Sequence, residues 1–192
     1  SCWGWRSSFC RESAATADSI RLKGGAIHTG TGVDRLTFEN GACTGAIAGG
    51  REISSDAVLT TLPNRVLLDL APQLPADYAA SLWAISYQGS LCCVLSLRSR
   101  LSDYYWINVA SRDMPFVALI EHTNFMSPED YGGRHLVYLG KYLGNEDPLF
   151  QESEESISRR FARELVRMFP EFDPERDVVQ AWVWRAPFTQ PV

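Results

Sequence analysis

Two short segments in the middle of the chain combine aromatic rings with groups that form hydrogen bonds. They are Tyr104–Asn108 (YYWIN) and Glu121–Asn124 (EHTN). Alternate residues of an extended strand lie on opposite faces, and in residues 116–125 both faces begin apolar and end polar. This pattern is typical of a strand that runs from a core into a binding cleft, although a strand that leaves the core for solvent has the same pattern. One face would carry Phe116, Ala118, Ile120, His122 and Asn124, and the other would carry Val117, Leu119, Glu121 and Thr123.

The familiar catalytic and phosphate-binding motifs do not occur in the sequence. Gly30–Gly32 begins the dinucleotide pattern G-x-G-x-x-G, but Arg35 stands at the third glycine position and strand-like residues follow, so a turn between strands is the better interpretation. Neither an NTPase P-loop nor a nucleophile elbow is present. The histidines His28, His122 and His135 lack the spacing of a helical metal site. We therefore expect no metal, and the motifs identify no catalytic residue.

The composition is that of a globular protein, and it excludes several classes of function. The net charge of −5 argues against nucleic acid as a partner, because that partner requires a basic face. No apolar run approaches the roughly 18–20 residues that span a bilayer, so we expect a cytoplasmic protein without a membrane span. An odd number of cysteines without a C-x-x-C motif indicates buried free thiols in a reducing compartment. They are Cys2, Cys10, Cys43, Cys92 and Cys93.

The first third of the chain predicts a helix followed by a small antiparallel sheet. Residues 7–23 have apolar residues at helical spacing and end at Gly24-Gly25. Asn40-Gly41 is the signal of a two-residue hairpin turn. A short apolar run, Ala57–Thr61, predicts a buried strand that ends before Leu62-Pro63. The other strands of this part are predicted over residues 26–29, 33–38, 42–48 and 51–53.

The remainder of the chain predicts a larger sheet with helices. The clearest helix is Ser153–Phe169, whose Ile157, Phe161 and Leu165 form one apolar side. Together the elements predict an α+β fold, with a mixed β-sheet that has helices packed on one face, a small antiparallel part before it, and a boundary at Pro63. Short helices are predicted over 64–71 and 75–85, and strands over 89–97, 104–109, 116–124, 135–143 and 177–185.

The order of these segments resembles that of the flavin-containing amine oxidase superfamily, which includes protoporphyrinogen oxidases, phytoene desaturases and monoamine oxidases. In residues 7–63 the resemblance rests on a helix, a Gly-Gly pair, a strand, the Asn-Gly hairpin, a Gly-Gly turn and the run DAVLTTLP. The later segments MPFVALIEHTNF, YGGRHLVYLGKYL and LVRMFPEFD are similar to the substrate lobe of bacterial protoporphyrinogen-oxidase-like enzymes. The resemblance covers most of the chain and depends on the order of segments.

The resemblance implies an FAD-dependent oxidoreductase in which a small-molecule substrate gives a hydride to the flavin. It implies that residues 1–63 belong to an FAD-binding lobe and residues 64–192 to a substrate-binding lobe. The residues placed against the cofactor would be Val33, Thr60, Thr61, Leu62 and Pro63. The residues placed around the substrate would be Tyr105, Trp106, Asn108, His122 and Asn124.

Two landmarks of the superfamily are missing from the sequence, the N-terminal G-x-G-x-x-G and the C-terminal glycine–acid segment. The first residue is not Met, and the last follows a strand-like run. We therefore interpret the chain as an internal part of a longer enzyme, which by itself binds FAD weakly or not at all and is inactive. Two alternatives stay open: a stand-alone, non-enzymatic α+β module that binds a small molecule, and a carotenoid- or sugar-handling relative that uses flavin without net oxidation.

Overall fold

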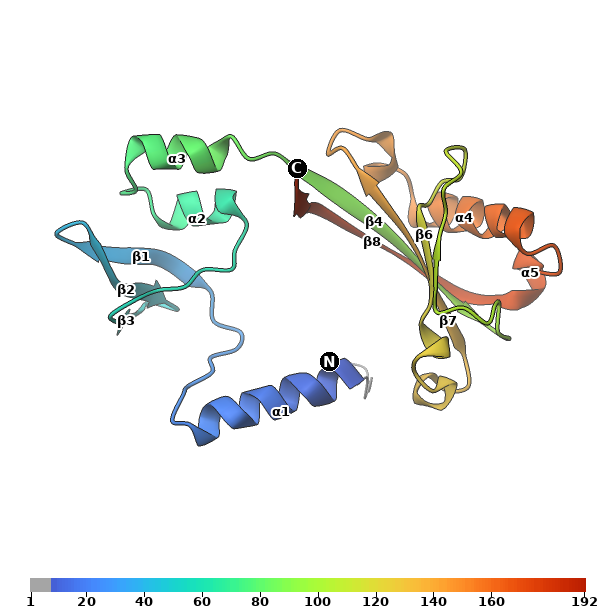
Figure 1. Cartoon of the computed structure of the whole chain (residues 1–192), viewed down its shortest axis with the longest axis horizontal. Coiled ribbons are helices and arrows are strands. Elements are labelled where there is room, and N and C mark those ends of the chain that lie inside the picture. Colours follow the sequence, from blue (N-terminus) through green and yellow to red (C-terminus); the bar gives the residue numbers. More distant parts are fainter. Residues whose placement is uncertain (1–7) are drawn as a thin grey trace. The chain divides into compact units, whose positions relative to one another are not determined.

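The structure, a computed structural model, describes residues 8–192, with side chains from residue 13 onward (Figure 1). The described chain forms two compact units, and each is considered by itself below. One unit consists of Tyr87–Gln190 with the beginning of the first helix up to Thr16, and the other consists of Ala17–Ser86 with Pro191–Val192.

The first helix, α1, spans Ser8–Leu22, close to the predicted bounds. Its end is closed by a hydrogen bond from the Gly25 amide to the Ile20 carbonyl (2.9 Å), and Gly24 has a φ of 84°, as glycine after a helix commonly does. Ser7, the first residue of the predicted helix, lies outside the described residues. No helix within residues 8–192 combines the length and the apolar character that crossing a membrane requires.

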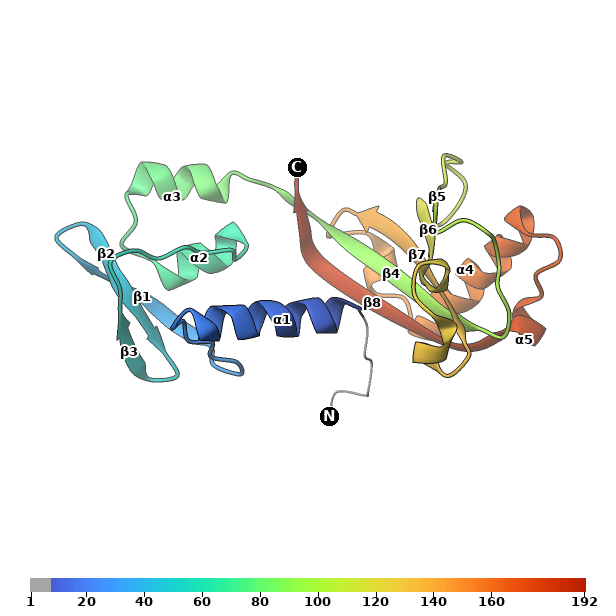
Figure 2. The same ribbon diagram turned by 60° about the horizontal axis from the view of Figure 1, so that its bottom comes forward.

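The unit that contains residues 17–86 has a three-stranded antiparallel sheet in the order β1-β2-β3 (Figure 2). β1 (Val33–Glu39) pairs with β2 (Ala42–Ala48), which pairs in turn with β3 (Arg51–Ser54). Asn40 and Gly41 form the turn between β1 and β2, with φ of 49° and 81°. Positive φ at both central residues is the turn geometry that matches the twist of paired strands, so the predicted hairpin is confirmed.

Two strands predicted in this part of the chain do not form. Ala26–Thr29 and Ala57–Thr61 are irregular, and Leu59, expected in a buried strand, is 91% exposed. A strand requires a neighbour that pairs its backbone, and the small sheet of the described residues consists of β1, β2 and β3 alone. The strand predictions for these two segments were therefore wrong for this chain.

Two short helices follow, α2 (Asn64–Leu70) and α3 (Ala76–Trp83), near their predicted positions. The two helices pack against each other, and α2 also contacts β1. These contacts include both helices in the smaller unit, so the units separate between Ser86 and Tyr87, beyond the boundary that we expected at Pro63. The assignment of the two parts to a cofactor and a substrate stays a prediction.

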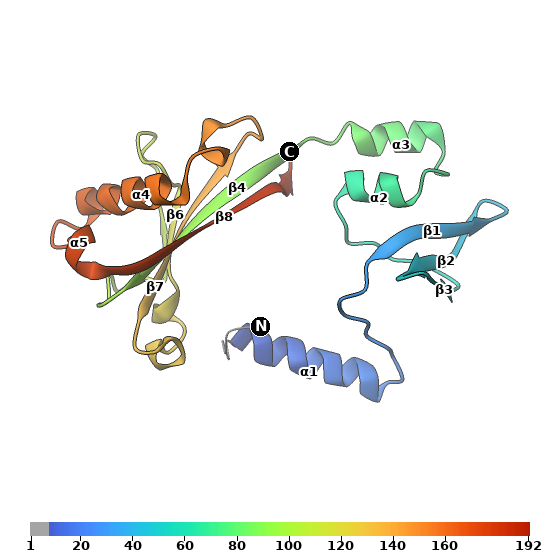
Figure 3. The same cartoon turned by 180° about the vertical axis from the view of Figure 1, so that it is seen from behind.

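The larger unit is built on a five-stranded sheet in the order β5-β6-β7-β4-β8 (Figure 2). The pairs β5–β6, β6–β7 and β4–β7 are antiparallel, a more regular arrangement than the mixed sheet that we expected. The long strands β4 and β8 lie side by side (Figure 3). The bounds are β4 (Tyr87–Leu97), β5 (Trp106–Asn108), β6 (Ala118–Glu121), β7 (His135–Leu143) and β8 (Val178–Pro191).

The helix α4 (Glu154–Met168) packs against one face of this sheet (Figure 1). Its N-terminus is capped by Ser153, whose hydroxyl accepts a hydrogen bond from the Ser156 amide (3.2 Å). The short helix α5 (Pro174–Asp177) follows α4, so the α+β class with helices on one face of the sheet is confirmed. Three short 3₁₀ turns complete the unit: η1 (His122–Asn124), η2 (Pro128–Tyr131) and η3 (Pro148–Phe150).

The hydrophobic core lies between α4 and the sheet, on a face that we call the covered face. Its α4 residues recur every four positions, as the apolar side of a helix requires. Burying each large side chain contributes about 1.5–3 kcal/mol to folding, so this layer holds the unit together. The core includes Leu91, Cys93, Leu95, Leu119, Val137 and Leu139 of the sheet and Ile157, Phe161 and Leu165 of α4.

The strands β5 and β6 are shorter than predicted. The chain turns into η1 directly after Glu121, so the strand predicted over 116–124 forms only over 118–121. Phe116 is buried, and its ring lies 5.6 Å from that of Phe161 (centroid to centroid). It therefore packs in the core under α4, whereas the strand pattern predicted that it shares a face with Ala118 and Ile120.

The hairpin between β1 and β2 gives the first testable prediction. Replacing Gly41 with Ala places a Cβ in open space, so the cost is purely conformational and comes from the φ of 81°. We expect the free energy of unfolding, measured by urea denaturation, to fall by about 1 kcal/mol. The matched control is Gly32→Ala, because a Cβ at Gly32 also meets nothing and the backbone there does not have a left-handed φ. Equal stability of the two variants would contradict the turn geometry.

Candidate functional site

The face of the larger sheet opposite α4 carries no charged side chain on β4, β5, β6 or β7, and we call this part of the sheet the open face. Residues paired across neighbouring strands lie on the same face of a sheet. Trp106 is paired with Ile120, Ile120 with Tyr138 and Tyr138 with Val94, so these four residues share one face. The same registers place the remaining members there: Ser90, Cys92, Ser96, Asn108, Ala118, Leu136, Gly140 and Tyr142.

Aromatic rings and small residues alternate along the open face. Trp106 and Tyr142 are about half exposed, and Tyr138 is half-buried. The indole nitrogen of Trp106 donates a hydrogen bond to the side-chain oxygen of Asn108 (2.8 Å), which restrains the ring. Gly140 lies between the two tyrosines of β7, and a Cβ added there would meet nothing. The face therefore combines flat apolar rings with room beside them, which is how surfaces that bind planar or apolar molecules are built.

A small polar cluster lies beside Tyr138. His122 Nε2 is 2.6 Å from the Tyr131 hydroxyl, and its ring lies edge-on to Tyr131 and Tyr138, with centroids 5.3 and 5.6 Å apart. Burial lowers the pKa of His122. Burial, together with the nearby Tyr131, Cys92 and Tyr105, raises the pKa of Tyr138. The cluster is thus uncharged at neutral pH and offers hydrogen-bonding groups without a net charge.

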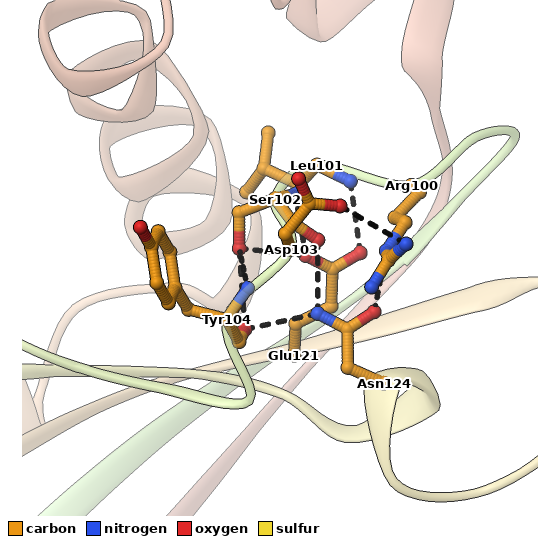
Figure 4. Close-up of polar contacts among 7 residues, drawn as sticks. All are labelled: Arg100, Leu101, Ser102, Asp103, Tyr104, Glu121 and Asn124. Atoms are coloured by element: carbon orange, nitrogen blue, oxygen red, sulfur yellow. Dashed lines mark hydrogen bonds and ion pairs between the residues drawn. The ribbon is translucent and has the colours of Figure 1, made fainter.

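Behind the aromatic segment lies a network centred on Glu121, the last residue of β6 (Figure 4). Its carboxylate is fully buried and accepts hydrogen bonds from the amides of Leu101 (2.8 Å) and Ser102 (2.7 Å). The hydroxyl of Ser102 lies 3.2 Å from the same carboxylate. The Glu121 amide donates to the carbonyl of Tyr105 (2.9 Å). One buried residue therefore holds the stretch from Leu101 to Tyr105, which leads into β5.

Asn124, in η1, uses both ends of its amide to hold the same segment (Figure 4). Its Nδ2 donates to the carbonyls of Ser102 and Tyr104, both at 2.9 Å. Its Oδ1 accepts a hydrogen bond of 2.7 Å from Arg100 Nε, and the Arg100 guanidinium also pairs with Asp103 (3.0 Å). With both of its polar ends engaged, Asn124 supports the segment from behind.

The substrate residues predicted from the sequence occupy three different settings. Trp106 and Asn108 lie on the open face, and His122 lies beside Tyr138 of that face. The ring of Tyr105 is 44% exposed and contacts Phe125 at 5.6 Å. The side chain of Asn124 is hydrogen-bonded to Arg100 and to the carbonyls of Ser102 and Tyr104. Their roles in binding a substrate stay predictions.

Sequence reasoning missed several residues that complete this site. Tyr138 and Tyr142 alternate along β7 with buried residues, and that period of two was a signal in the sequence. Phe125 is 74% exposed beside Tyr105, and nothing in its sequence context separates it from a core residue. The role of Glu121 also had no local signal, because its partners lie about twenty residues earlier in the chain.

The residues predicted to contact FAD lie in the smaller unit. Val33 begins β1 and is 42% exposed, and Thr60–Pro63 is irregular backbone that leads into α2. Exposed backbone and an apolar edge fit the periphery of a flavin nucleotide. The pyrophosphate is a different matter, because it requires amides at a helix N-terminus without nearby acids. α3, α4 and α5 each have acidic residues in the first turn, and the glycines before Val33 lead into a strand. α2 has no acid in its first turn, but it spans only seven residues and follows Leu62-Pro63 in place of a glycine loop. The described residues therefore fit the edge of FAD but not its phosphates.

The paired thiols of β4 are unsuited to nucleophilic chemistry. Cys92 lies on the open face, and burial raises its pKa to about 11. Burial and the adjacent Cys92 raise the pKa of Cys93 to about 12. Only the thiolate is reactive, so both are inert at neutral pH. Cys43, Cys92 and Cys93 are free, as predicted, but only Cys93 is fully buried; the side chains of Cys2 and Cys10 lie outside the description.

A hollow of about 480 Å³ lies elsewhere in the larger unit, between Ser99–Leu101 and Met168–Phe172. Its cations already have partners: Arg176 binds both carboxylate oxygens of Asp177, and Arg100 is engaged by Asn124. The hollow therefore presents no free cation to an anionic ligand, its remaining charged residue is the exposed Glu171, and the open face is the better candidate.

The fold and the site define an α+β chain whose larger sheet has one core face and one uncharged, aromatic face. Residues 11–189 match the family described as flavin containing amine oxidoreductase. This match covers most of the sequence, so the chain belongs to that family, and the resemblance noted in the sequence is confirmed. No curated protein matches the chain.

Solved structures share the fold at low sequence identity. An oxidoreductase from Methanosarcina mazei has a TM-score of 0.73 at 20% identity, covering 91% of this chain and 42% of that protein. A candidate protoporphyrinogen oxidase from Exiguobacterium sp. 255-15 has a TM-score of 0.68 at 16% identity, covering 94% and 39%. A reduced UDP-galactopyranose mutase has a TM-score of 0.58 at 15% identity, covering 77% and 32%. The chain thus spans about two fifths of the first two proteins.

The polar cluster gives a prediction about pH. Because the pKa of His122 is lower in the folded state than its ordinary value of about 6.5, the unfolded chain binds a proton more readily. The contribution of His122 to the free energy of unfolding should therefore be constant above about pH 7 and decrease as the pH drops below about 6.5. We expect His122→Phe, which keeps a ring against Tyr138 but cannot titrate, to lose less stability between pH 7 and pH 5.

Urea denaturation of both proteins at half-unit pH intervals measures this difference. The interval from pH 7 to pH 8 serves as the internal control, because His122 is neutral there in both states. Parallel stability curves down to pH 5 would show that burial of His122 is not linked to folding.

Proposed function

We propose that this chain supplies the substrate-binding region of an FAD-dependent oxidoreductase, and that the open face is the wall against which the substrate lies. Membership of the flavin containing amine oxidoreductase family supports the reaction class. The single observation that supports the location is the absence of charge among the twelve open-face residues, in a chain where 21% of residues are charged. Nine of the twelve are at least partly exposed, and three, Val94, Ser96 and Leu136, are buried. A surface of a soluble domain normally carries charges unless it contacts something apolar.

The chemistry of the open face favours a ligand with a flat, uncharged ring system. Trp106 and Tyr138 present ring faces or edges, and rings gain about 0.5–1.5 kcal/mol from stacking beyond the area that they bury. A phosphate or carboxylate placed on this face would lose water without gaining a cationic partner, so the two propionates of a porphyrin would have to extend past the face into solvent. The Exiguobacterium protein, described as a candidate protoporphyrinogen oxidase, is named for a porphyrin-type substrate, whose ring system fits such a face. The diphosphate in the name of the mutase fits it less well.

In the proposed reaction the flavin of the whole enzyme, when bound, supplies the hydride acceptor. The residues of this chain would hold and orient the substrate and exclude water. Trp106 and Tyr138 would stack on it, and Asn108 and His122 would bind its polar groups. His122 is neutral at pH 7 because burial lowers its pKa, so its ring has one nitrogen that donates and one that accepts a hydrogen bond.

Binding of a planar probe to the chain tests the location. We would titrate the protein with protoporphyrin IX and follow the quenching of tryptophan fluorescence. We expect saturable quenching, and we expect Trp106→Ala to weaken binding by about tenfold, which corresponds to about 1.4 kcal/mol of stacking and burial. Trp83→Ala is the matched control, since Trp83 is a similarly exposed tryptophan of the other compact unit and should leave the affinity unchanged.

A second titration, with UDP-galactose, separates the two kinds of ligand. We expect no binding, because the open face has no cation for the diphosphate. Binding of UDP-galactose that depends on Trp106, without binding of protoporphyrin IX, would overturn the proposed ligand class. Porphyrin binding that is indifferent to Trp106 would overturn the proposed location.

The cofactor gives a further prediction, which concerns the chain by itself. The described residues lack a phosphate site, and each 1.4 kcal/mol of lost binding energy lowers affinity tenfold. We therefore expect the 192-residue chain to purify colourless, to bind added FAD weakly or not at all, and to turn over no substrate. An absorbance spectrum across the flavin bands, followed by a titration with FAD, measures this. A yellow protein with stoichiometric flavin would show that the chain holds a complete cofactor site.

A further inference from the structure

We propose that Glu121 and Asn124 are positioning residues of the open face, which fix Tyr105 and Trp106 in the conformation that binds the ligand without touching the ligand themselves. This inference rests on the proposed function. It concerns how the site is held, whereas the proposed function concerns what the site binds.

The first step of the argument is the burial of Glu121. A carboxylate that is fully removed from water is costly unless charge-assisted hydrogen bonds compensate it. Here the compensation comes from two backbone amides, those of Leu101 and Ser102, at 2.8 and 2.7 Å. The bonds are made to the backbone, so they fix the path of the chain regardless of the side chains at these two positions.

The second step is the complementary grip of Asn124 on the same segment. Glu121 takes the amides of residues 101 and 102, and Asn124 takes the carbonyls of Ser102 and Tyr104. Donors and acceptors of one short turn are thus both bound by one short stretch, the end of β6 and η1. Arg100 closes the network by donating to Asn124 and pairing with Asp103 (Figure 4).

The third step links this grip to the aromatic rings. The Glu121 amide binds the Tyr105 carbonyl at 2.9 Å, and β5 begins with Trp106 at the next residue. Tyr105 therefore ends the stretch of backbone that Glu121 and Asn124 bind, and Trp106 follows directly on it. Tyr104, Tyr105 and Trp106 are 68%, 44% and 52% exposed, so packing alone holds them weakly. Phe125 contacts the Tyr105 ring and Asn108 restrains the Trp106 ring, while the backbone grip fixes the chain that carries both rings.

The final step concerns the benefit of such order. Aromatic side chains that project into solvent lose conformational freedom when a ligand binds, and a site that is already rigid avoids much of that cost. A buried carboxylate adds little net stability to a protein, because an apolar side chain of similar volume in its place often stabilises the fold equally well. It is an effective way to hold a polar turn in one conformation.

Asn124→Asp is the test, because it keeps the shape and the oxygen that faces Arg100 but replaces the donor to two carbonyls with a repelling oxygen. We expect the affinity for protoporphyrin IX to fall by at least tenfold, with the far-UV circular dichroism unchanged. Amide chemical shifts of residues 101–106 should move in the NMR spectrum. The matched control is Asn145→Asp, which removes a comparable amide bond to the Tyr87 carbonyl (3.2 Å) away from the aromatic segment and should leave the affinity unchanged.

A second variant keeps the test decisive if Asn124→Asp fails to fold. Arg100→Ala alters a half-exposed side chain, removes the bond to Asn124 and should weaken porphyrin binding about threefold. A merely structural role predicts a lower free energy of unfolding with an unchanged dissociation constant for the folded molecules. If Trp106→Ala weakens binding and neither Asn124→Asp nor Arg100→Ala does, the positioning role is wrong while the proposed function stands. If Trp106→Ala has no effect, the proposed function itself fails.

Discussion

The arrangement of the larger unit depends on one constraint: a sheet has two faces, and α4 packs against only one of them. The antiparallel register of β4 with β7 sends Leu91, Cys93 and Leu95 to the covered face together with Leu139 and Val137. The alternate positions must then face the other way, whatever they are. A chain that fills those positions with Trp, Tyr, Ile and Gly, and with no charge, has a second face that is chemically suited to an apolar molecule.

A different physical problem arises at the edge of the sheet. The three-residue strand β5 does not by itself fix the conformation of the segment that leads into it. A connection that crosses the end of a sheet leaves amides and carbonyls without strand partners, and these must find other groups. Glu121 and Asn124 bind them from the neighbouring strand end, where β6 ends and η1 begins. The bonds to the aromatic segment are thus made at the point where the chain leaves the sheet.

The sequence contains the signals of local structure more fully than those of the site. The hairpin at Asn40-Gly41, the helix α4 and the strand β7 were predictable, since each depends on residues within a few positions of one another. Ala57–Thr61 has strand-like residues, but a strand is a property of a pair, and its pairing partner is not among the described residues. Likewise, the sequence around Asn124 is typical of a ligand contact. Its hydrogen-bond partners in residues 100–104 are brought to it by tertiary structure and have no local signal in the sequence.

The architecture of the molecule carries less functional information than individual side chains do. Proteins that share this fold at 15–20% identity include an oxidoreductase and a mutase, so the architecture alone does not select a reaction. Apolar packing tolerates many exchanges of similar volume, and a covered face is therefore compatible with many chemistries. The open face differs in this respect, because in the proposed function a substrate would meet its individual side chains. Under that proposal, discrimination between ligands would depend on positions such as Trp106 and Tyr138 and on the groups that hold them in place.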